Sequence, residues 1–527
     1  MGAAQVELNK KTFIQLEELA SEAYEKGDYT SAIKIIKILA AFAFDNYSSV
    51  LYSEKAESIL NSISEKYSID DLKLELDSKK QVLHVLSEAY PIGGHSMMVK
   101  NWILNKFSNE THSIFLNWQN PEDAPKWLTE TVLTNNGKTL SAKKFNDNIE
   151  KALYLRSIAN NFDYVVFHIH PFDPLVNLAF GYKGCKTKRI LLDNVDHGFW
   201  LGADAVDLIA NLRSFGKYLS VLKRHSNKSV ILNIVLNPKI SNMSKEEARK
   251  KIGVDKNAKM LLSVARAPKY DSNGKVNFIE TAKKIVNRCE NCKLIVIGPS
   301  KEDKKWAEAY EQTKGKIEAV GPLDGDISPY HIASDLYLIS FPIESTTACL
   351  EQAIYGRNIV RLDCGRMDTI DTIKKLMYIV KTEDEYIEKA LYLLENNYIN
   401  NELRDRVTEM HTGEGWRKQV AEIYRLLDGK LPLDLKTDVP DKEKIIDGFE
   451  KFNATITETP NLWFRCFMNE LEMPYKKKAL KITKRYKLRR NILQKLYSFA
   501  CRRMPAGRKI YSFARLKYHE IKDKKRK

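Results

Sequence analysis

The pattern of hydrophobic positions along this chain changes near residue 80. Residues 1–78 place apolar side chains at helical spacing, as at Phe13, Leu16 and Leu19. The polar segment 24–29, with Gly27 and Asp28 at its centre, predicts a turn between two helices. The spacing is typical of one tetratricopeptide-type hairpin, and no further copy follows at the expected period. We therefore expect a helical cap and not a solenoid.

After residue 80, short apolar runs alternate with amphipathic segments in two series. The first series predicts strands over residues 81–87, 113–118, 164–170, 189–193 and 230–236. The second series predicts strands over residues 259–264, 293–297, 317–320, 336–341 and 358–362. Regular alternation of strand and helix indicates parallel sheets, and two series indicate an α/β protein with two Rossmann-like domains. Ligands of such domains bind at the carboxyl ends of the strands, here in the cleft between the domains.

The length of 527 residues supports several domains, because a single core stops growing near ~250–300 residues. The composition shifts place five parts along the chain. They are a helical cap (1–78), an N-terminal Rossmann-like domain (79–240), a connector (241–258), a C-terminal Rossmann-like domain (259–430) and a basic helical extension (431–527).

The positive charge of the protein is concentrated at the end of the chain. The formal net charge is +17, but residues 475–527 alone carry +19, so the first 474 residues sum to −2. Aromatic and aliphatic residues lie between the lysines and arginines, and Tyr497-Ser-Phe-Ala500 recurs as Tyr511-Ser-Phe-Ala514. This pattern favours an anionic membrane surface as the partner. Nucleic acid is a less favoured partner, and a solvated tail is the remaining alternative.

The seven cysteines show no disulfide framework, and the polar N-terminus does not resemble a signal peptide. No apolar run approaches the ~20 residues of a membrane-spanning helix. We therefore expect free thiols in a reducing cytoplasm.

The segment 338–356 carries the most functional information. An apolar strand leads through a short loop into a helix, and the loop and helix contain Glu344 and Glu351. Small hydroxyl residues begin the helix: Ser345, Thr346 and Thr347. Unpaired amides and the helix dipole at such a start favour a phosphate group. An ordinary strand–helix unit remains the alternative.

Two further strand ends suggest anion binding. Gly93, Gly94 and His95 follow the first strand, where glycine permits close approach of the backbone to a ligand. The pattern is not the dinucleotide fingerprint, so no dinucleotide cofactor is expected. Arg266 and Lys269 directly follow the first strand of the second series, where they could neutralise a diphosphate. A tight turn and plain surface charge are the respective alternatives.

Polar residues at two other strand ends suit a sugar. His168 and His170 end one strand and share a face, with Asp173 just beyond. Asp196 and His197 follow the next strand beside glycine and tryptophan. Sugars need fixed hydrogen bonds and an apolar surface, which such clusters supply. A structural histidine pair and a buried polar turn are the alternatives.

Four of these segments occur in an order that resembles the GT-B glycosyltransferases, specifically the large retaining family 4 of bacterial polysaccharide and lipid-linked sugar transferases. They are HVLSEAYPIGGHSMMVKNWI, FDYVVFHIHPFDPLVNLAF, LLSVARAPK and ASDLYLISFPIESTTACLEQAIYG. The resemblance covers roughly residues 80–430. It departs from the family pattern in two spacings. Six residues separate Glu344 from Glu351 where the family has seven. The family lysine lies five residues after the arginine, whereas here Lys269 lies three and Lys275 nine residues after Arg266, and either lysine could take that role.

The resemblance implies transfer of a sugar from a nucleotide-sugar to a hydroxyl group of a lipid-linked or surface-glycan acceptor, with retention, without metal and without a cofactor. The implied catalytic residues are His170, Glu344, Arg266 and Lys269. The implied donor-binding residues are Gly93, Gly94, His95, Arg266, Lys269, Ser345, Thr346, Thr347 and Glu351. Asp173, Asp196 and His197 are the expected acceptor or sugar contacts. The implied location is the inner face of the cell membrane.

Two other functions stay open. The helical N-terminal cap suggests a protein glycosyltransferase as one alternative. The shifted position of Glu344 is compatible with a protein that binds nucleotide-sugar or nucleic acid without catalysis.

Overall fold

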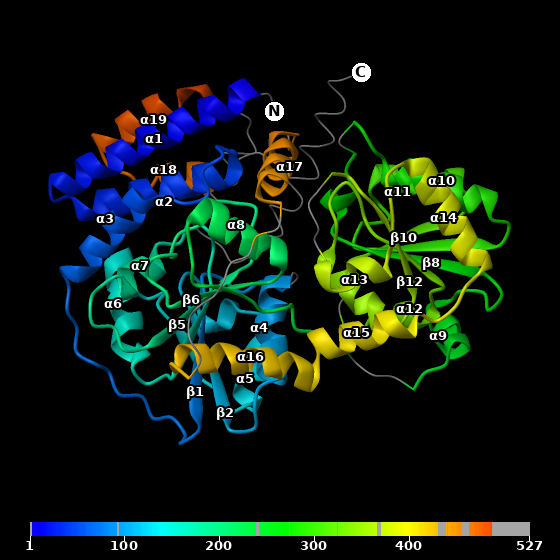
Figure 1. Cartoon of the computed structure of the whole chain (residues 1–527), viewed down its shortest axis with the longest axis horizontal. Helices are drawn as coiled ribbons and strands as arrows, with labels where there is room; N and C mark the ends of the chain where they lie inside the picture. The colour runs from blue at the N-terminus through cyan, green and yellow to red at the C-terminus, as the bar shows by residue number, and fades with distance from the viewer. Residues whose placement is uncertain are drawn as a thin grey trace.

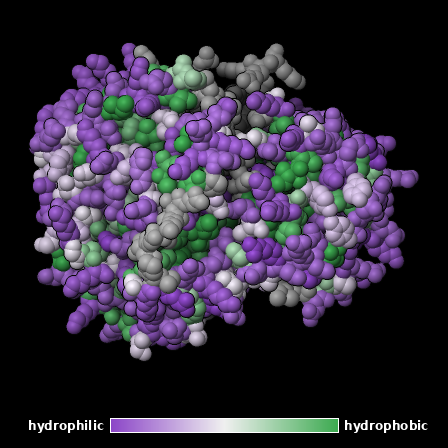
Figure 2. Space-filling model, in the orientation of Figure 1, coloured by the Kyte–Doolittle hydropathy of each residue, from purple (hydrophilic) through white to green (hydrophobic). Residues whose placement is uncertain are grey.

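Figure 1 shows the computed structural model of the chain. It describes residues 3–91, 94–238, 242–272, 274–323, 325–365, 370–430, 439, 441–455 and 463–486. Gly93 and the last 41 residues of the basic extension, 487–527, lie outside the described residues. On the face seen in Figure 2 the surface is mostly hydrophilic, with hydrophobic residues in separate patches.

The N-terminal part is helical, as the sequence predicts. Its helices are α1 (Ala3–Glu25), α2 (Tyr29–Asp45) and α3 (Glu54–Glu65). The turn between α1 and α2 uses Gly27 at φ +76°, which glycine adopts without strain. Asp28 then caps α2 by accepting a hydrogen bond from the Ser31 amide. α2 is buried almost all round because it packs between α1 and a helix of the C-terminal extension.

The first sheet has seven parallel strands in the order β3-β2-β1-β4-β5-β6-β7. The strands are β1 (Lys80–Leu86), β2 (Glu110–Leu116), β3 (Thr139–Ser141), β4 (Tyr164–His168), β5 (Lys188–Asp193), β6 (Leu208–Asn211) and β7 (Ser229–Ile231). The helices of this domain are α4 (Gly94–Leu104), α5 (Lys126–Thr134), α6 (Asn148–Ala159), α7 (Leu175–Phe180) and α8 (Ser214–Arg224).

The second sheet has six parallel strands in the order β10-β9-β8-β11-β12-β13. The strands are β8 (Lys259–Val264), β9 (Cys292–Ile297), β10 (Ile317–Gly321), β11 (Leu336–Leu338), β12 (Asn358–Leu362) and β13 (Tyr378–Val380). The helices are α9 (Lys245–Ile252), α10 (Phe278–Arg288), α11 (Lys304–Gln312), α12 (Ser328–Ala333), α13 (Thr346–Ala353), α14 (Glu383–Glu395) and α15 (Asn401–His411). The prediction of two Rossmann-like domains is confirmed.

The strand predicted over residues 230–236 is wrong in length. β7 ends at Ile231, and the following backbone leaves the sheet. The Leu236 amide donates to the carbonyl of His411, and the Asn233 amide donates to the Gln419 side chain. The backbone amides of this apolar run thus find their hydrogen-bond acceptors in the second domain and in the helix after it, and not in a neighbouring strand. The sequence did not predict β6, because its apolar run 208–210 is only three residues long, and it did not predict α8, which follows that strand.

The helix α16 (Gly413–Leu427) follows the second sheet in sequence but packs against the first (Figure 1). The Trp416 indole donates to the Asn233 carbonyl at 2.8 Å and packs edge-on against Trp102. Tyr424 stacks on Tyr164 with ring centroids 3.9 Å apart. This helix therefore connects the two domains a second time.

The extension contains α17 (Lys442–Thr455), α18 (Trp463–Met468) and α19 (Tyr475–Ile482). Although more than 400 residues separate them in sequence, α18 packs against α2 and α19 against α1 (Figure 1). Phe42 of α2 contacts Phe464 at 5.6 Å between centroids. α1, α2, α18 and α19 thus form one helical layer.

Two buried charges attach the cap to the first domain. Glu57 of α3 is fully buried and accepts hydrogen bonds from the Asp204 amide at 3.0 Å and from the Asn177 side chain at 2.7 Å. Burial raises the pKa of Glu57 to about 7. Arg156 of α6 donates to the carbonyls of Tyr67 and Ala179. Because both side chains are buried and form hydrogen bonds across the boundary, the cap is part of the same folded unit.

Three buried histidines form a chain across neighbouring strands. His84 Nδ1 lies 3.0 Å from His168 Nε2, and His84 Nε2 lies 2.8 Å from His112 Nδ1. His112 Nε2 lies 3.1 Å from a Glu110 carboxylate oxygen. If that oxygen accepts, each of the three histidines carries its proton on Nε2, and His112 and His84 accept on Nδ1 from the next histidine in the row. Burial lowers the pKa of all three histidines, most strongly those of His84 and His168.

The row of three buried histidines predicts that the folded protein loses stability in acid. The folded protein keeps the three histidines neutral, whereas the unfolded chain protonates them below about pH 6.5, so unfolding takes up protons. Together they reduce the free energy of unfolding by at most about 4 kcal/mol per pH unit below that value. Urea unfolding between pH 8 and pH 5 measures the slope. His168→Asn, whose amide can still donate to His84, should reduce the histidine contribution by about one third; an unchanged slope contradicts the explanation.

Candidate active site between the two domains

The helix starts predicted to bind phosphate come from different domains and meet. Gly94 is the first residue of α4, directly after β1, and Thr347 lies in the first turn of α13. A Cβ atom on Gly94 would lie 3.3 Å from Thr347 Oγ1. Ser345 and Thr346 stand beside Thr347 at the same helix start. Two helix N-termini with their amide groups thus converge, an arrangement that stabilises an anion.

The cations predicted after β8 lie at the same edge of the second sheet. Arg266 is exposed and precedes the 3₁₀ turn η2 (Ala267–Tyr270). Lys269 Nζ donates to the Glu344 carbonyl at 2.7 Å and so contacts the loop that leads into α13. Gly298, after β9, keeps this edge compact, because a Cβ atom there would meet the Ala265 carbonyl at 2.1 Å.

Glu344 is held by a buried cation of its own domain. Arg361 of β12 donates through Nε to Glu344 Oε1 at 2.6 Å, and the side chains are 3% and 4% exposed. This pair anchors the loop between β11 and α13 to the next strand. Its predicted catalytic role stays a prediction, and the geometry gives it a positioning role as well.

Arg213 is a site residue that the sequence did not single out. It follows β6 and forms an ion pair with Asp196 through two nitrogens, one of them at 2.7 Å. Burial disfavours the charged form of Arg213, but Asp196 and, from the second domain, Glu344 outweigh it and raise its pKa. The neighbouring Ser214 amide donates to Asp371 across the domains at 2.7 Å. The signal available was a polar Asn-Leu-Arg-Ser segment after a short apolar run.

The Asp196 carboxylate is therefore occupied by its ion pair with Arg213. Its burial opposes ionisation, but Arg213 and His197 outweigh the burial and hold its pKa well below the usual value. His197 Nδ1 lies 3.4 Å from Asp196, and the histidine side chain is 40% exposed. Of the two predicted sugar contacts, Asp196 and His197, the histidine is the more exposed.

His170 lies beyond the end of β4 beside His95 of α4. The two rings are parallel with centroids 6.1 Å apart. Tyr90 donates to Glu88, so the 2.8 Å contact between Tyr90 Oη and His170 Nε2 places the histidine proton on Nε2. Burial lowers the pKa of His95 to about 4 and, with His95, that of His170 to about 3. Both rings are neutral at pH 7, and Nδ1 of His170 carries a lone pair.

Asp173 is 1% exposed and its carboxylate is surrounded by donors. Asn117 donates to both oxygens, Ser87 donates to one, and the Leu175 amide donates at 3.1 Å. Burial raises its pKa against these bonds. The predicted contact with an acceptor stays a prediction, and the burial favours a role in fixing the loops after β1, β2 and β4.

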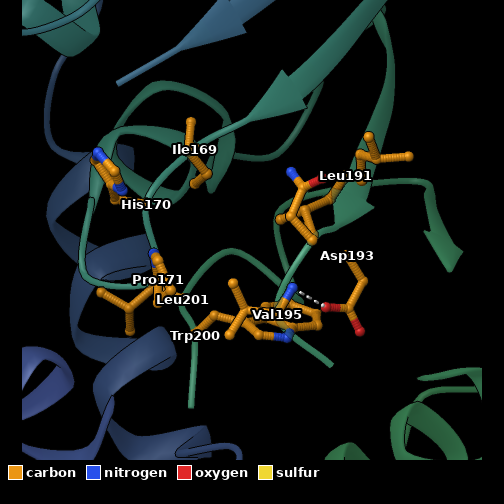
Figure 3. Close-up of a pocket in the computed structure, with 10 residues that line it drawn as sticks. Ile169, His170, Pro171, Leu191, Asp193, Val195, Trp200 and Leu201 are labelled. Atoms are coloured by element: carbon orange, nitrogen blue, oxygen red, sulfur yellow. Dashed lines mark hydrogen bonds between the residues drawn. The ribbon is translucent and has the colours of Figure 1, made fainter. Parts of the chain in front are cut away.

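A small pocket lies between the ends of β4 and β5 (Figure 3). His170 and Asp193 lie on opposite sides of it, and the Val195 amide donates to Asp193 at 3.1 Å. Its volume of about 20 Å³ admits one water molecule and not a sugar ring. The pocket is therefore part of the wall of the site and not the ligand site itself.

Glu351 lies in α13 about one and a half turns after the helix start that is predicted to bind phosphate. Burial raises its pKa to about 7, so at neutral pH it can both donate to and accept from hydroxyl groups. In the described part of the chain, no three His, Cys, Asp or Glu side chains come together as metal ligands.

No family model and no curated protein matches the sequence. Solved structures do match. A glycosyltransferase from Rickettsia africae is 15% identical, with 67% of this chain and 100% of that chain covered and a TM-score of 0.53. TarM is 10% identical, with 67% and 99% covered and a TM-score of 0.51. Anabaena HepE in complex with UDP-glucose is 10% identical, with 66% and 99% covered and a TM-score of 0.50.

The chain has the GT-B fold. At these identities the likeness shows the fold alone. The GT-B part from β1 to α16 makes up about two-thirds of the chain, which is the share that these neighbours cover. The cap and the extension are additional to it.

The buried Glu344–Arg361 pair yields a stability prediction. Glu344→Ala leaves a buried guanidinium without its carboxylate, so we expect the free energy of unfolding to fall by about 3–5 kcal/mol. Adding Arg361→Met should recover part of that loss, because the uncompensated charge is then removed. Urea unfolding measures both. Glu388→Ala, which breaks the exposed pair with Arg288, is the matched control and should leave stability nearly unchanged. Equal effects of the Glu344 and Glu388 variants would contradict this assignment.

Proposed function

We propose that this protein is a glycosyltransferase that moves a sugar from a nucleotide-sugar to a hydroxyl group of an acceptor. The observation that carries the proposal is the meeting of Gly94 and Thr347, which brings two helix N-termini together at the facing strand ends of a GT-B fold. Arg266 and Lys269 lie at the same edge. A diphosphate bridging a nucleoside and a sugar fits this combination of amides and cations.

The proposed roles of the residues follow from the place where negative charge develops during sugar transfer. As the bond to the anomeric carbon breaks, negative charge grows on the leaving diphosphate. Arg266, Lys269 and the amides at the start of α13 would stabilise that charge. We place the ribose at Glu351, whose carboxyl group can exchange hydrogen bonds with hydroxyls, and the donor sugar beside Gly94 and His170.

We further propose retention of configuration, without a metal, as the resemblance to family 4 implies. The carboxyl groups predicted near the reaction centre support this, because they already accept hydrogen bonds from protein donors. Glu344 accepts from Arg361, and Asp173 accepts from Asn117 and Ser87. Neither is placed as an open general base. The leaving phosphate would then accept the proton of the acceptor hydroxyl.

Release of nucleoside diphosphate from a panel of UDP- and GDP-sugars tests the function. We expect release from one donor, with Arg266→Ala slowing it about tenfold or more because a cation is lost from the diphosphate. Glu351→Ala should weaken binding of the same nucleotide. Arg425→Ala removes an exposed arginine of α16 and is the control. Binding of a nucleotide without turnover would favour the non-catalytic alternative, and neither binding nor turnover would overturn the proposal.

For the acceptor we propose a lipid-linked or surface-glycan intermediate used at the cytoplasmic face of a membrane. The described start of the basic extension supports this, because α19 exposes Lys477, Leu480 and Lys481 on one surface. Met473 is 68% exposed beside them. Apolar side chains between lysines suit an anionic headgroup layer. Among the residues that the structure describes, no helix has the length and apolar character of a membrane span.

Sedimentation with phospholipid vesicles tests this surface. The full chain should bind vesicles that contain phosphatidylglycerol and not those of phosphatidylcholine alone, and salt should weaken the binding. Replacing Lys477, Lys481 and Lys484 by glutamine should reduce it, since each cation contributes up to about 1 kcal/mol. The same change at the exposed Lys250, Lys251 and Lys256 of the second domain is the control. Equal binding to both kinds of vesicle, or to neither, would contradict the proposal.

A further inference from the structure

Aromatic rings from separate parts of the chain surround His170. Trp118, just beyond β2, lies nearly parallel to the His170 ring with centroids 5.2 Å apart. Trp463 of α18 lies 5.9 Å from the same histidine and 6.2 Å from Trp118. Phe172 packs beneath, 5.3 Å from Trp463. The C-terminal extension therefore reaches the end of β4, where the candidate active site begins.

The cap and the extension also bring charges to these rings. Lys37 of α2 places its ammonium group 5.4 Å from the centre of the Trp118 ring and 4.1 Å from that of Phe467. Glu470, just after α18, accepts a hydrogen bond from Lys37 at 3.3 Å. Lys37 is only 7% exposed, so a cation is kept almost out of water beside the aromatic rings. We call Trp118, His170, Trp463, Lys37 and Glu470 the aromatic–lysine cluster.

Exposure separates the rings that pack from those that face solvent. Phe172 is 1% and Phe467 is 5% exposed, so these two rings are the packing that attaches α18. Trp118 and Trp463 remain partly exposed although they are the larger side chains. Their partly exposed surfaces are available for contact with a ligand.

We propose that the aromatic–lysine cluster is a subsite for a sugar ring of the acceptor, assembled by the cap and the extension on the GT-B core. A pyranose ring has an apolar face that lies flat on an indole, and hydroxyl groups that both donate and accept hydrogen bonds. Lys37 donates, Glu470 accepts, and Nδ1 of His170 accepts. The cluster offers both kinds of polar partner beside the rings, as sugar recognition requires.

The position of the cluster agrees with this assignment. His170 stacks on His95, which follows Gly94 at the start of α4, so the cluster adjoins the proposed donor site from the first domain. An acceptor held there would present its hydroxyl group toward the donor sugar. The GT-B neighbours cover about two-thirds of this chain, and the cluster draws Lys37, Trp463 and Glu470 from outside the β1–α16 span. That the sugar is an acceptor rests on the proposed function; that a sugar binds does not.

Sugar binding to the full chain tests the proposal without any donor. The probes are the methyl glycosides of glucose, galactose, mannose and N-acetylglucosamine, each at about 10 mM, followed by saturation-transfer NMR. This concentration reveals a site with a Kd near 1 mM. We expect transfer to the ring protons of at least one glycoside, and a loss of affinity of about tenfold in Trp463→Ala and in Trp118→Ala. Trp463→Phe, which keeps a ring, should retain part of the binding.

Two controls separate recognition from packing. Trp127 is also partly exposed and also has a lysine, Lys100, over its ring, but it lies on α5 away from the cluster, so Trp127→Ala should not change binding. Phe467→Ala should lower the thermal midpoint by loosening α18, and melting of every variant shows which ones keep the extension attached. Absence of transfer to all four glycosides, or equal losses in the Trp127 and Trp463 variants, would overturn the subsite. Nucleotide binding in the same samples would show that the proposed donor function stands independently.

Discussion

The close approach of α4 and α13 is the constraint on which the candidate site depends. In each domain the strands are parallel, so their carboxyl ends and the helix starts that follow lie along one edge. A site arises only if the two edges face each other at backbone distance. Gly94 meets this condition because it has no side chain where Thr347 stands. The double connection between the domains, through the segment after β7 and through α16, holds the two edges in this relation.

Buried charges then fix the loops that line the site. Glu344 is held by Arg361, and Asp196 by Arg213; Asp173 is held by Asn117 and its neighbours. In a medium of low polarity such pairs are strongly directional, and removing one partner leaves the other uncompensated. The carboxylates closest to the proposed reaction centre therefore shape it. The exposed Arg266 and the neutral His95 and His170 are the residues from which the proposed function draws its ligand contacts.

The cap and the extension are structural parts of the first domain and not appendages. Glu57 and Arg156 satisfy buried amide and carbonyl groups on both sides of the boundary between cap and domain. α18 and α19 complete the same layer by packing on α2 and α1 (Figure 1). Because α18 also reaches His170, the cap and the described helices of the extension border the proposed acceptor side of the site. Substrate selection by the additional helices is thus compatible with a common GT-B core.

The sequence by itself determined the two parallel sheets and the helical hairpin, and it singled out candidate site residues at the strand ends. These follow from local patterns: alternation of apolar runs, glycine after a strand, and hydroxyl residues at a helix start. It failed where partners are distant in sequence. The apolar run after Ile231 predicts a strand, but its amides donate to Gln419 and His411. No local pattern shows those distant partners. Arg213, Trp463 and Lys37 join the candidate site only through tertiary packing. Their partners are brought to them by burial and charge pairing, which spacing along the chain does not show.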